Sequence, residues 1–401
     1  MSLKEYIKCV AYKNIVEETF SHAFTQEEAK KVISYHKSFP EYEMTPLVNL
    51  NQLAKECGVK AIYVKDESYR FRQNAFKVLG GSFAIANYIA KKLGMTLEEM
   101  TYETITSEEI REKLGEMTFV TATDGNHGRG VAWTANRLKQ KCVVYMPKGT
   151  AKERLENIRA LGADAMIMEC NYDDCVRLAT EHSKKYGWVL IQDTAFEGYE
   201  EVPSWIMQGY LTMMEETVEQ LGEVCPTHVF LQAGVGAMAG SMTGYLASHY
   251  MEEKPTIVIV EPEKADCIFK TAKEDDGRLH YVTGDLDTIM AGLACGEPCS
   301  IGWEVMKRYA EYYISMPDEV AADGMRILGN PLNGDEKVIS GESGAAGFGF
   351  AMELLRKEEL AELKQELKLD EESVILCIST EGDTDKENYR RIVWDGKYFN
   401  R

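Results

Sequence analysis

The most constraining feature of this chain is a repeated alternation of short apolar runs with amphipathic segments. Within each run most residues are apolar, and apolar and polar residues do not alternate. In the segments between the runs, apolar residues recur with the period of a helix that buries one face. Continuous apolar strands are typical of parallel sheets that helices cover on both faces. We therefore expect an α/β fold built from doubly wound parallel sheets. The predicted strands are residues 61–65, 118–121, 142–146, 165–168, 188–191, 228–231, 256–260 and 374–378.

The amphipathic segments predict the helices that cover these sheets. In such folds the ligand lies beyond the carboxyl ends of the strands, so residues that directly follow a strand are the first candidates for a site. The predicted helices are residues 76–94, 129–139, 153–161, 173–186, 206–221 and 241–249.

Composition excludes several classes of partner. The 401 residues carry a net charge of −20, which argues against nucleic acid or an anionic membrane surface as a partner. Residues 1–20 lack the apolar core of a signal peptide, and no stretch is long enough to span a membrane, so we expect a cytoplasmic protein. The ten cysteines form no CxxC pair and no Cys/His ligand spacing. We expect free thiols and no metal site.

A lysine opens one predicted helix, at the end of the segment Asn74–Lys77. Its neighbours Phe76 and Val78 are apolar, so Lys77 has no simple structural role there. Burial lowers the pKa of an amine and makes it the nucleophile that imine formation requires. The alternative is a lysine on the solvated face of the helix.

A second motif, Thr123–Gly128, lies between a predicted strand and a predicted helix. Its backbone N–H groups would favour an anion at the start of the helix. Asn126 is a candidate ligand of a bound ring, and we expect His127 to be structural. Asp124 is a candidate acid or base, although an Asp at this position also commonly serves as a helix N-cap.

The third motif is the glycine-rich segment Gly234–Gly240, which follows the strand 228–231. Glycines let the backbone approach a phosphate closely. A dinucleotide-binding pattern fits poorly because Ala239 occupies the position of its last glycine, and no Lys-Ser/Thr pair follows to make a P-loop. Along the chain come first a lysine, then a turn that contains Asn, and then a glycine-rich loop. A pyridoxal phosphate (PLP) site of the tryptophan-synthase type needs these three parts in this order. The lysine forms the Schiff base, the turn lies against the ring and the loop holds the phosphate.

Two further positions follow predicted strands. Asp193 comes after the strand 188–191, where a ligand contact and a turn or helix cap are about equally plausible. Ser379 and Thr380 come after the strand 374–378, and a hydroxyl there could meet the pyridine nitrogen of PLP as a neutral partner.

With these residues the chain resembles the fold-type-II PLP enzymes, and within them the diaminopropionate ammonia-lyases. The resemblance extends over most of the chain and rests on long matching segments. These are Val64–Ser68, Asn74–Lys77, Thr123–Trp133, Tyr145–Gly149, Trp205–Tyr210, Gln232–Gly240, Ile289–Pro298 and Ser379–Asp385.

The resemblance implies PLP as cofactor, with Lys77 as the Schiff-base lysine and Asn126 at the 3′-oxygen of the ring. It implies a hydroxyl at the ring nitrogen and the glycine loop at the phosphate. The implied cofactor contacts are Phe76, Lys77, Asn126, Gly234, Val235, Gly236, Ala237, Met238, Ala239, Gly240, and Ser379 or Thr380.

The resemblance also implies the reaction, an elimination that converts D- or L-2,3-diaminopropionate into pyruvate and two ammonia. Opposite enantiomers present their Cα–H to opposite faces of a planar cofactor complex, so two bases on opposite sides are expected. The candidates are Lys77, Asp124 and Asp193. The related dehydratases carry Ser where this chain has Asp124, which argues against an ordinary serine or threonine dehydratase.

The alternatives are another PLP-dependent β-eliminase of amino acids, a catalytically silent amino-acid-binding protein on the same fold and, more remotely, a Rossmann dehydrogenase. By resemblance we expect a homodimer. We also expect a large PLP-binding domain of residues 1–87 plus 199–401, with a small α/β domain inserted at residues 88–198. Cys267 and Cys295 are candidates for a redox-sensitive link, although two separate thiols are the simpler expectation in a cytoplasmic protein.

Overall fold

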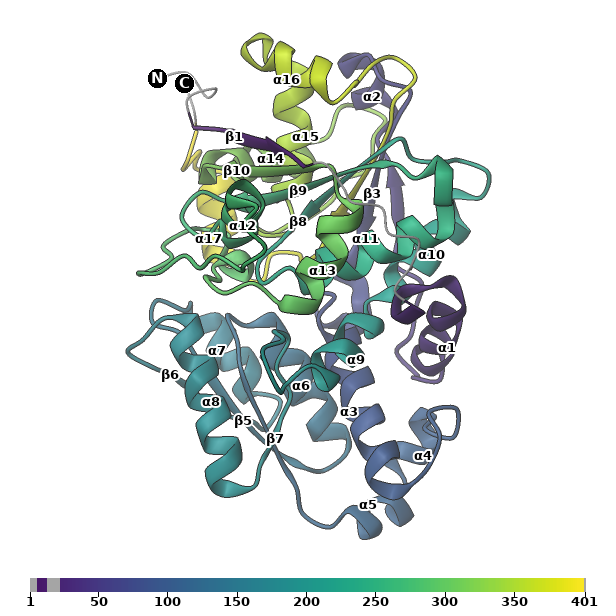
Figure 1. Cartoon of the computed structure of the whole chain (residues 1–401), viewed down its shortest axis with the longest axis vertical. Coiled ribbons are helices and arrows are strands. Elements are labelled where there is room, and N and C mark those ends of the chain that lie inside the picture. Colours follow the sequence, from purple (N-terminus) through teal and green to yellow (C-terminus); the bar gives the residue numbers. More distant parts are fainter. Residues whose placement is uncertain (1–5, 13–21, 400–401) are drawn as a thin grey trace.

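The computed structural model describes residues 6–12 and 22–399, so most of the segment examined for a signal peptide lies outside the described residues. Two β-sheets lie one above the other along the longest axis of the molecule (Figure 1). The larger sheet has the strand order β1-β10-β9-β8-β11-β3-β2, and the smaller has the order β6-β5-β4-β7.

The strands of the larger sheet are β1 (Lys8–Ala11), β2 (Leu47–Asn49), β3 (Ala61–Asp66), β8 (His228–Gln232), β9 (Thr256–Pro262), β10 (Tyr312–Met316) and β11 (Val374–Ser379). Those of the smaller sheet are β4 (Thr118–Ala122), β5 (Lys141–Met146), β6 (Asp164–Ile167) and β7 (Val189–Leu190).

All neighbouring strands are parallel except at the two edges of the larger sheet. There β1 pairs antiparallel with β10, and β2 pairs antiparallel with β3. The predicted α/β class with parallel sheets is confirmed, and eight of the strands coincide with predicted ones. The edge strands β1 and β2, together with β10, were not predicted.

Helices cover both faces of the larger sheet. Along β8, Val229 and Leu231 face one apolar core and Phe230 faces the other, so successive side chains alternate between the two layers. The first layer contains α11 (Ala237–Tyr250), α12 (Cys267–Glu274) and α13 (Ser300–Tyr309). The second contains α2 (Asn51–Cys57), α14 (Asp318–Gly329), α15 (Ala346–Arg356) and α17 (Lys386–Val393).

Most of the remaining helices surround the smaller sheet or lie where the two sheets meet, whereas α16 packs on α15 at the far end of the larger sheet (Figure 1). These remaining helices are α1 (Gln26–Lys37), α3 (Val78–Leu93), α4 (Tyr102–Thr106), α5 (Glu108–Leu114), α6 (Asn126–Arg137), α7 (Lys152–Arg159), α8 (Tyr172–Tyr186), α9 (Glu201–Gly209), α10 (Leu211–Leu221) and α16 (Ala361–Glu366). Short 3₁₀ turns are η2 (His22–Phe24), η3 (Glu67–Arg72), η4 (Met251–Glu253), η5 (Ala291–Leu293) and η6 (Glu358–Leu360).

One predicted helix is divided in the structure. The segment 206–221 falls into α9 and α10, which meet at Tyr210. The division lies where the chain passes α3 at close range: a Cβ added to Gly209 would lie 2.6 Å from the Leu79 carbonyl oxygen. The predicted domain boundaries at residues 87/88 and 198/199 stay a prediction, and the strands of the smaller sheet fall between residues 118 and 190.

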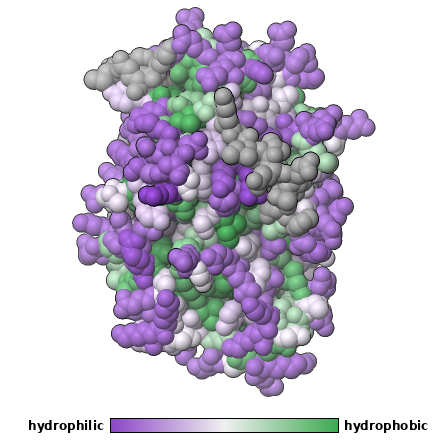
Figure 2. Space-filling view, in the orientation of Figure 1, coloured by the Kyte–Doolittle hydropathy of each residue, from purple (hydrophilic) through white to green (hydrophobic). Residues whose placement is uncertain are grey.

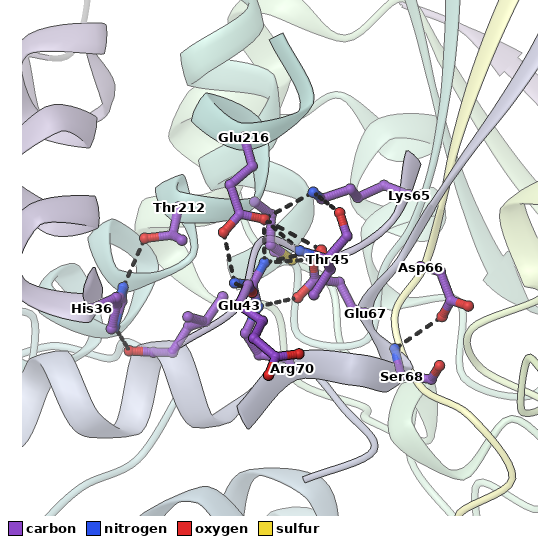
Figure 3. A network of polar contacts seen from close by, with 12 residues as sticks. His36, Glu43, Thr45, Lys65, Asp66, Glu67, Ser68, Arg70, Thr212 and Glu216 are labelled. Atoms are coloured by element: carbon purple, nitrogen blue, oxygen red, sulfur yellow. Dashed lines mark hydrogen bonds and ion pairs between the residues drawn. The ribbon is translucent and has the colours of Figure 1, made fainter. Parts of the chain in front are cut away.

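A buried polar network connects the end of β3 to α10 (Figure 3). The Glu216 carboxylate accepts from Lys65 Nζ at 2.8 Å and from Arg70 Nη2 at 2.7 Å. Arg70 also donates to Glu67 at 2.8 Å, and Thr45 donates to Glu67 at 2.7 Å. The four charged side chains are at most 1% exposed, so each charge depends on its partners.

Directly after this network the backbone takes an unusual course. Phe71, Arg72 and Asn74 have φ angles of +46°, +58° and +56°, a region that side-chain-bearing residues rarely adopt. Such strain persists where the surroundings fix the chain on both sides. The network holds the chain before this segment, which leads into Lys77.

No helix among the described residues is both long and apolar enough to cross a membrane. The face in Figure 2 is mostly hydrophilic at its outline, with hydrophobic residues in smaller patches between. This distribution is ordinary for a folded chain.

Glu216→Gln tests the network. The change leaves Lys65 and Arg70 buried with only the Glu67 carboxylate, so we expect the free energy of unfolding in urea to fall by about 3 kcal/mol. Glu219→Gln, at an exposed position of the same helix, is the control and should change that free energy by less than about 0.5 kcal/mol. Equal unfolding free energies for the two variants would contradict the role given to the network.

Candidate active site

The carboxyl ends of strands from both sheets surround one cavity. In the larger sheet, the segments that follow β3 and β11 pair with each other: Phe76 N donates to Thr380 O at 3.1 Å, and Gly382 N donates to Asn74 O at 3.1 Å. The other walls come from the segments after β4, β7 and β8 and from residues 292, 293, 295 and 343. The sequence-predicted residues that line it are Phe76, Lys77, Asn126, Asp193, Gly234, Val235, Gly236, Ala237, Met238, Ala239 and Thr380.

Lys77 lies at the start of α3 and faces this cavity. Its Nζ donates to Asp193 Oδ2 at 2.9 Å. Burial alone would lower the pKa of Lys77, but the negative charges of Asp193 and Asp124 outweigh it and raise the pKa above its ordinary value. The expectation that burial lowers this pKa is therefore wrong for the cofactor-free chain, because the lysine is buried together with its counter-ions.

Asp193 is bound on both carboxylate oxygens. In addition to Lys77, it accepts from the Tyr172 hydroxyl at 3.0 Å and from Gln192 Nε2 at 3.1 Å. Burial would raise the pKa of Asp193, but Lys77 and the nearby His127 lower it below its ordinary value. The sequence left open whether Asp193 contacts a ligand or caps a turn or helix. Its contacts are not those of a cap, and Asp193 lines the cavity.

Asp124 is not the cap of α6. The Thr123 hydroxyl accepts from the backbone N–H groups of Gly125 at 2.9 Å and Gly128 at 3.0 Å, which leaves the Asp124 carboxylate available. Its nearest cation is Arg154, whose Nη1 lies 3.4 Å from Oδ2. Burial raises the pKa of Asp124, and the charges of Lys77 and Arg154 only partly oppose this.

Asp124 opens onto a second cavity, which adjoins the first. Arg154 and Glu342 share its lining with Asp124, together with residues 285–289 and the start of α8. Burial raises the pKa of Glu342 to about 7. Residues 291 and 294 line this cavity while 292, 293 and 295 line the first, so one short segment separates the two.

The other residues of the Thr123–Gly128 turn face in different directions. Asn126 lines the Lys77 cavity, and its Nδ2 donates to Glu381 Oε2 at 2.5 Å. His127 points away to the smaller sheet, where Nε2 lies 2.7 Å from the Ile191 carbonyl oxygen. Burial lowers the pKa of His127, and the nearby charge of Asp193 opposes this shift.

The glycine-rich segment ends earlier than the sequence predicted. Helix α11 begins at Ala237, so only Gly234–Gly236 form the loop, and the first N–H groups of the helix have no intrahelical acceptor. Gly236 has φ = +90°. Gly240 does not line the cavity: a Cβ there would lie 2.7 Å from Gly302 Cα, so this glycine permits close packing of α11 against α13.

Of the two candidate hydroxyls, one faces the cavity. Thr380 lines it and accepts from Gln232 Nε2 at 3.1 Å. Ser379 instead donates to Ser340 Oγ at 2.8 Å, because alternate side chains of a strand point to opposite faces, and it is absent from the lining.

Three comparisons connect this geometry with known proteins. A family model described as "Pyridoxal-phosphate dependent enzyme" matches residues 39–380. The chain is 50% identical over 381 residues to the diaminopropionate ammonia-lyase of Escherichia coli strain K12, with 94% of each chain covered. The chain belongs to the diaminopropionate ammonia-lyase family of PLP-dependent enzymes.

Solved structures of this family have the same fold. The holo diaminopropionate ammonia lyase of Escherichia coli matches with a TM-score of 0.92 and 48% identity, over 98% of this chain and 97% of that chain. The same enzyme in complex with D-serine matches with a TM-score of 0.91 and 46% identity, over 98% of each chain.

The cavity residues fit the cofactor of this family. Lys77 provides the amine, and the start of α11 provides backbone donors for a phosphate. Two buried polar atoms at the lining, the Tyr210 hydroxyl and Gln232 Oε1, have no hydrogen-bond partner among the described residues. Phe76 packs on Tyr210 with ring centroids 4.7 Å apart and gives the cavity an apolar wall.

Sequence reasoning did not assign Tyr172, Arg154 or Glu381 to the site. Tyr172 and Arg154 lie in helices of the smaller sheet, and no local pattern relates them to Asp193 or Asp124. Glu381 did have a signal, because it is the second residue after β11 and lies within a segment of resemblance. Cys267 and Cys295 are both free thiols, in agreement with the simpler expectation.

Asp193→Asn tests how Lys77 is controlled. In the cofactor-free chain, burial should then count for more than the remaining attraction to Asp124, so the pKa of Lys77 should fall. The measurement is the pH dependence of Lys77 acylation by an amine-reactive reagent, read by peptide mass spectrometry, and its midpoint should move to lower pH. Asp174→Asn, in the exposed first turn of α8, should leave the midpoint unchanged. An unchanged midpoint in Asp193→Asn would contradict this account.

Proposed function

We propose that this chain uses PLP to eliminate ammonia from both D- and L-2,3-diaminopropionate, and that with one water the products are pyruvate and two ammonia. The observation that carries the proposal is the position of the Lys77 amine. It donates a hydrogen bond to Asp193, and it lies close enough to Asp124 for the negative charge of that carboxylate to raise the pKa of the lysine. Bound PLP would supply an electron sink at the carbon that loses its proton.

The chain's own residues would hold the cofactor. The loop Gly234–Gly236 and the first N–H groups of α11 would bind the phosphate, where the helix dipole favours an anion. Asn126 would donate to the 3′-oxygen, and Thr380 would meet the ring nitrogen. Phe76 would exclude water from one side of the cavity.

Lys77, Asp124 and Asp193 would move the protons. The two carboxylates come from different loops, after β4 and after β7, so they approach Lys77 from separate segments. The Cα–H bonds of the two enantiomers point in opposite directions, and bases on two sides could serve both. An amine leaves more readily when protonated, and a buried carboxyl with a raised pKa near the leaving amine could keep it so.

We also propose that the protein works in the cytoplasm as a homodimer, with a large domain of residues 1–87 plus 199–401 and a small domain of residues 88–198. The ten free thiols agree with a reducing compartment. The four-stranded sheet, whose strands lie between residues 118 and 190, supports the proposed insertion. Light scattering of the purified protein should give twice the mass of one chain.

The first experiment mixes the purified, PLP-loaded protein with D- and L-2,3-diaminopropionate in separate reactions. We expect pyruvate and ammonia in a ratio of one to two from each enantiomer. Formation of a 2-oxo acid only from serine, threonine or cysteine would overturn the named substrate and leave the cofactor. No product from any of these amino acids would favour a silent binding protein.

Asp124→Asn and Asp193→Asn separate the two carboxylates. A lost general base or acid slows turnover by about 100-fold or more. We expect each variant to lose kcat to that extent with one enantiomer and to keep kcat within about tenfold with the other. The two variants serve as each other's control, because each replaces a buried carboxylate near Lys77. Equal losses with both enantiomers in both variants would refute the assignment of one base to each face.

A further inference from the structure

We infer that Glu381 is a positioning residue that fixes which way the Asn126 amide faces, and so decides whether Asn126 offers the cofactor a donor or an acceptor. The inference rests on the proposed function, in which Asn126 meets the 3′-oxygen of PLP. It concerns a residue to which neither the sequence motifs nor the proposed chemistry assigned a role.

Glu381 is 1% exposed, and donors meet both of its carboxylate oxygens. Oε2 accepts from Asn126 Nδ2 at 2.5 Å and from the Thr384 hydroxyl at 3.2 Å. Oε1 accepts from the backbone N–H of Ser343 at 3.2 Å. An ionised carboxylate can only accept hydrogen bonds, and these three donors all suit that form.

This arrangement permits one orientation of the Asn126 amide. If the amide were turned over, Asn126 Oδ1 would face Glu381 Oε2, and two acceptors would meet in a buried site with no donor between them. The nitrogen therefore stays on the side of Glu381. It carries two hydrogens, of which Glu381 takes one, and the second remains for a ligand in the cavity that Asn126 lines.

The backbone of Glu381 is tied to the segment that precedes Lys77. Glu381 forms an antiparallel bridge with Ala75, and Gly341 N donates to Glu381 O at 2.9 Å. A Cβ at Gly382 would lie 2.1 Å from Asn74 Oδ1, so a larger residue at this crossing would have to displace the Asn74 side chain. Asn126 begins α6, directly after the turn that follows β4 of the smaller sheet, and Glu381 thus holds its amide in register with Lys77, which comes from the side of the larger sheet.

Further polar contacts connect Glu381 to Asp124. The Thr384 hydroxyl that donates to Glu381 accepts from Arg154 Nη2 at 3.1 Å. Arg154 Nη1 in turn lies 3.4 Å from Asp124. One set of contacts thus connects the amide at the first cavity with the carboxylate at the second.

Glu381→Gln tests the inference with little change in shape. The new amide must keep its oxygen towards Ser343 N, which places its NH₂ group opposite Asn126 Nδ2. Two donors then face each other, and Asn126 should turn over and present Oδ1 to the cavity. A ligand oxygen that carries negative charge would lose its donor.

The readouts are the dissociation constant of PLP and the visible absorption of the bound cofactor as a function of pH. We expect PLP to bind about tenfold more weakly, as for the loss of one hydrogen bond to a charged group. The pH at which the absorption changes should rise, because the 3′-oxygen holds a proton more tightly once its donor is gone. Glu353→Gln removes another buried carboxylate, on α15 and outside both cavities, and should leave both readouts unchanged.

A double-variant cycle shows whether Glu381 acts through Asn126. Asn126→Ala alone should shift both readouts, and Glu381→Gln added to it should shift them no further. An additional shift in the double variant would overturn the inference, since Glu381 would then act on the cofactor directly. If Asn126→Ala shifts the readouts and Glu381→Gln does not, the inference fails and the cofactor contact stands.

Two further outcomes can be distinguished: a failure of the Glu381→Gln variant to fold, and a failure of the proposed substrate while the inference holds. If Glu381→Gln fails to fold, Glu381→Asp keeps the charge but withdraws it from Asn126, and unchanged readouts in that variant would overturn the inference. Pyruvate and ammonia from 2,3-diaminopropionate are measured on the unmodified protein in parallel. Their absence, together with the expected absorption shifts, would refute the proposed substrate and still support the role of Glu381.

Discussion

A buried ammonium group must have a counter-charge close by, and this requirement organises the centre of the molecule. The side chains of Lys77 and Asp193 are 15% and 3% exposed. If either one were removed, the other would be left as an unpaired charge with little access to water. Lys77 follows a strand of the larger sheet, whereas Asp193 follows a strand of the smaller sheet. Their ion pair therefore fixes the two sheets relative to each other at the point where the chemistry takes place.

The position of Lys77 depends in turn on a strained approach. From the last residues of η3 to Asn74 the chain passes through three residues with positive φ, and contacts on both sides keep it there. On one side, Arg70 is bound to Glu216 within the buried network (Figure 3). On the other side, residues 74–76 pair with the segment that follows β11. An ordinary turn would be more stable locally, but it would not bring the lysine into register with Thr380 and Glu381.

Local sequence predicts the features that depend on local burial. A parallel strand covered on both faces requires a continuous apolar run, so the inner strands other than β10, and the residues that follow them, such as Asp193, could be located. The edge strands β1 and β2 are short and only partly buried, and they carry no such run. The contact between Arg70 and Glu216 joins residues 146 positions apart, and only the folded chain brings them together. The Thr123 hydroxyl, and not the Asp124 carboxylate, accepts from the backbone N–H groups at the start of α6, and this too depends on side-chain direction, which residue type does not reveal.

The two aspartates near Lys77 differ because of what else surrounds them. Asp193 has Lys77, the Tyr172 hydroxyl and the Gln192 amide as donors, and the lysine with His127 lowers its pKa. Asp124 has only the longer contact to Arg154, and burial together with the charge of Glu381 raises its pKa. Neighbouring carboxyls whose surroundings move their pKa values apart can divide acid and base work between them. The difference in pKa follows from one difference in position: Asp193 meets the lysine directly, whereas Asp124 faces the adjoining cavity and has Arg154 as its nearest cation.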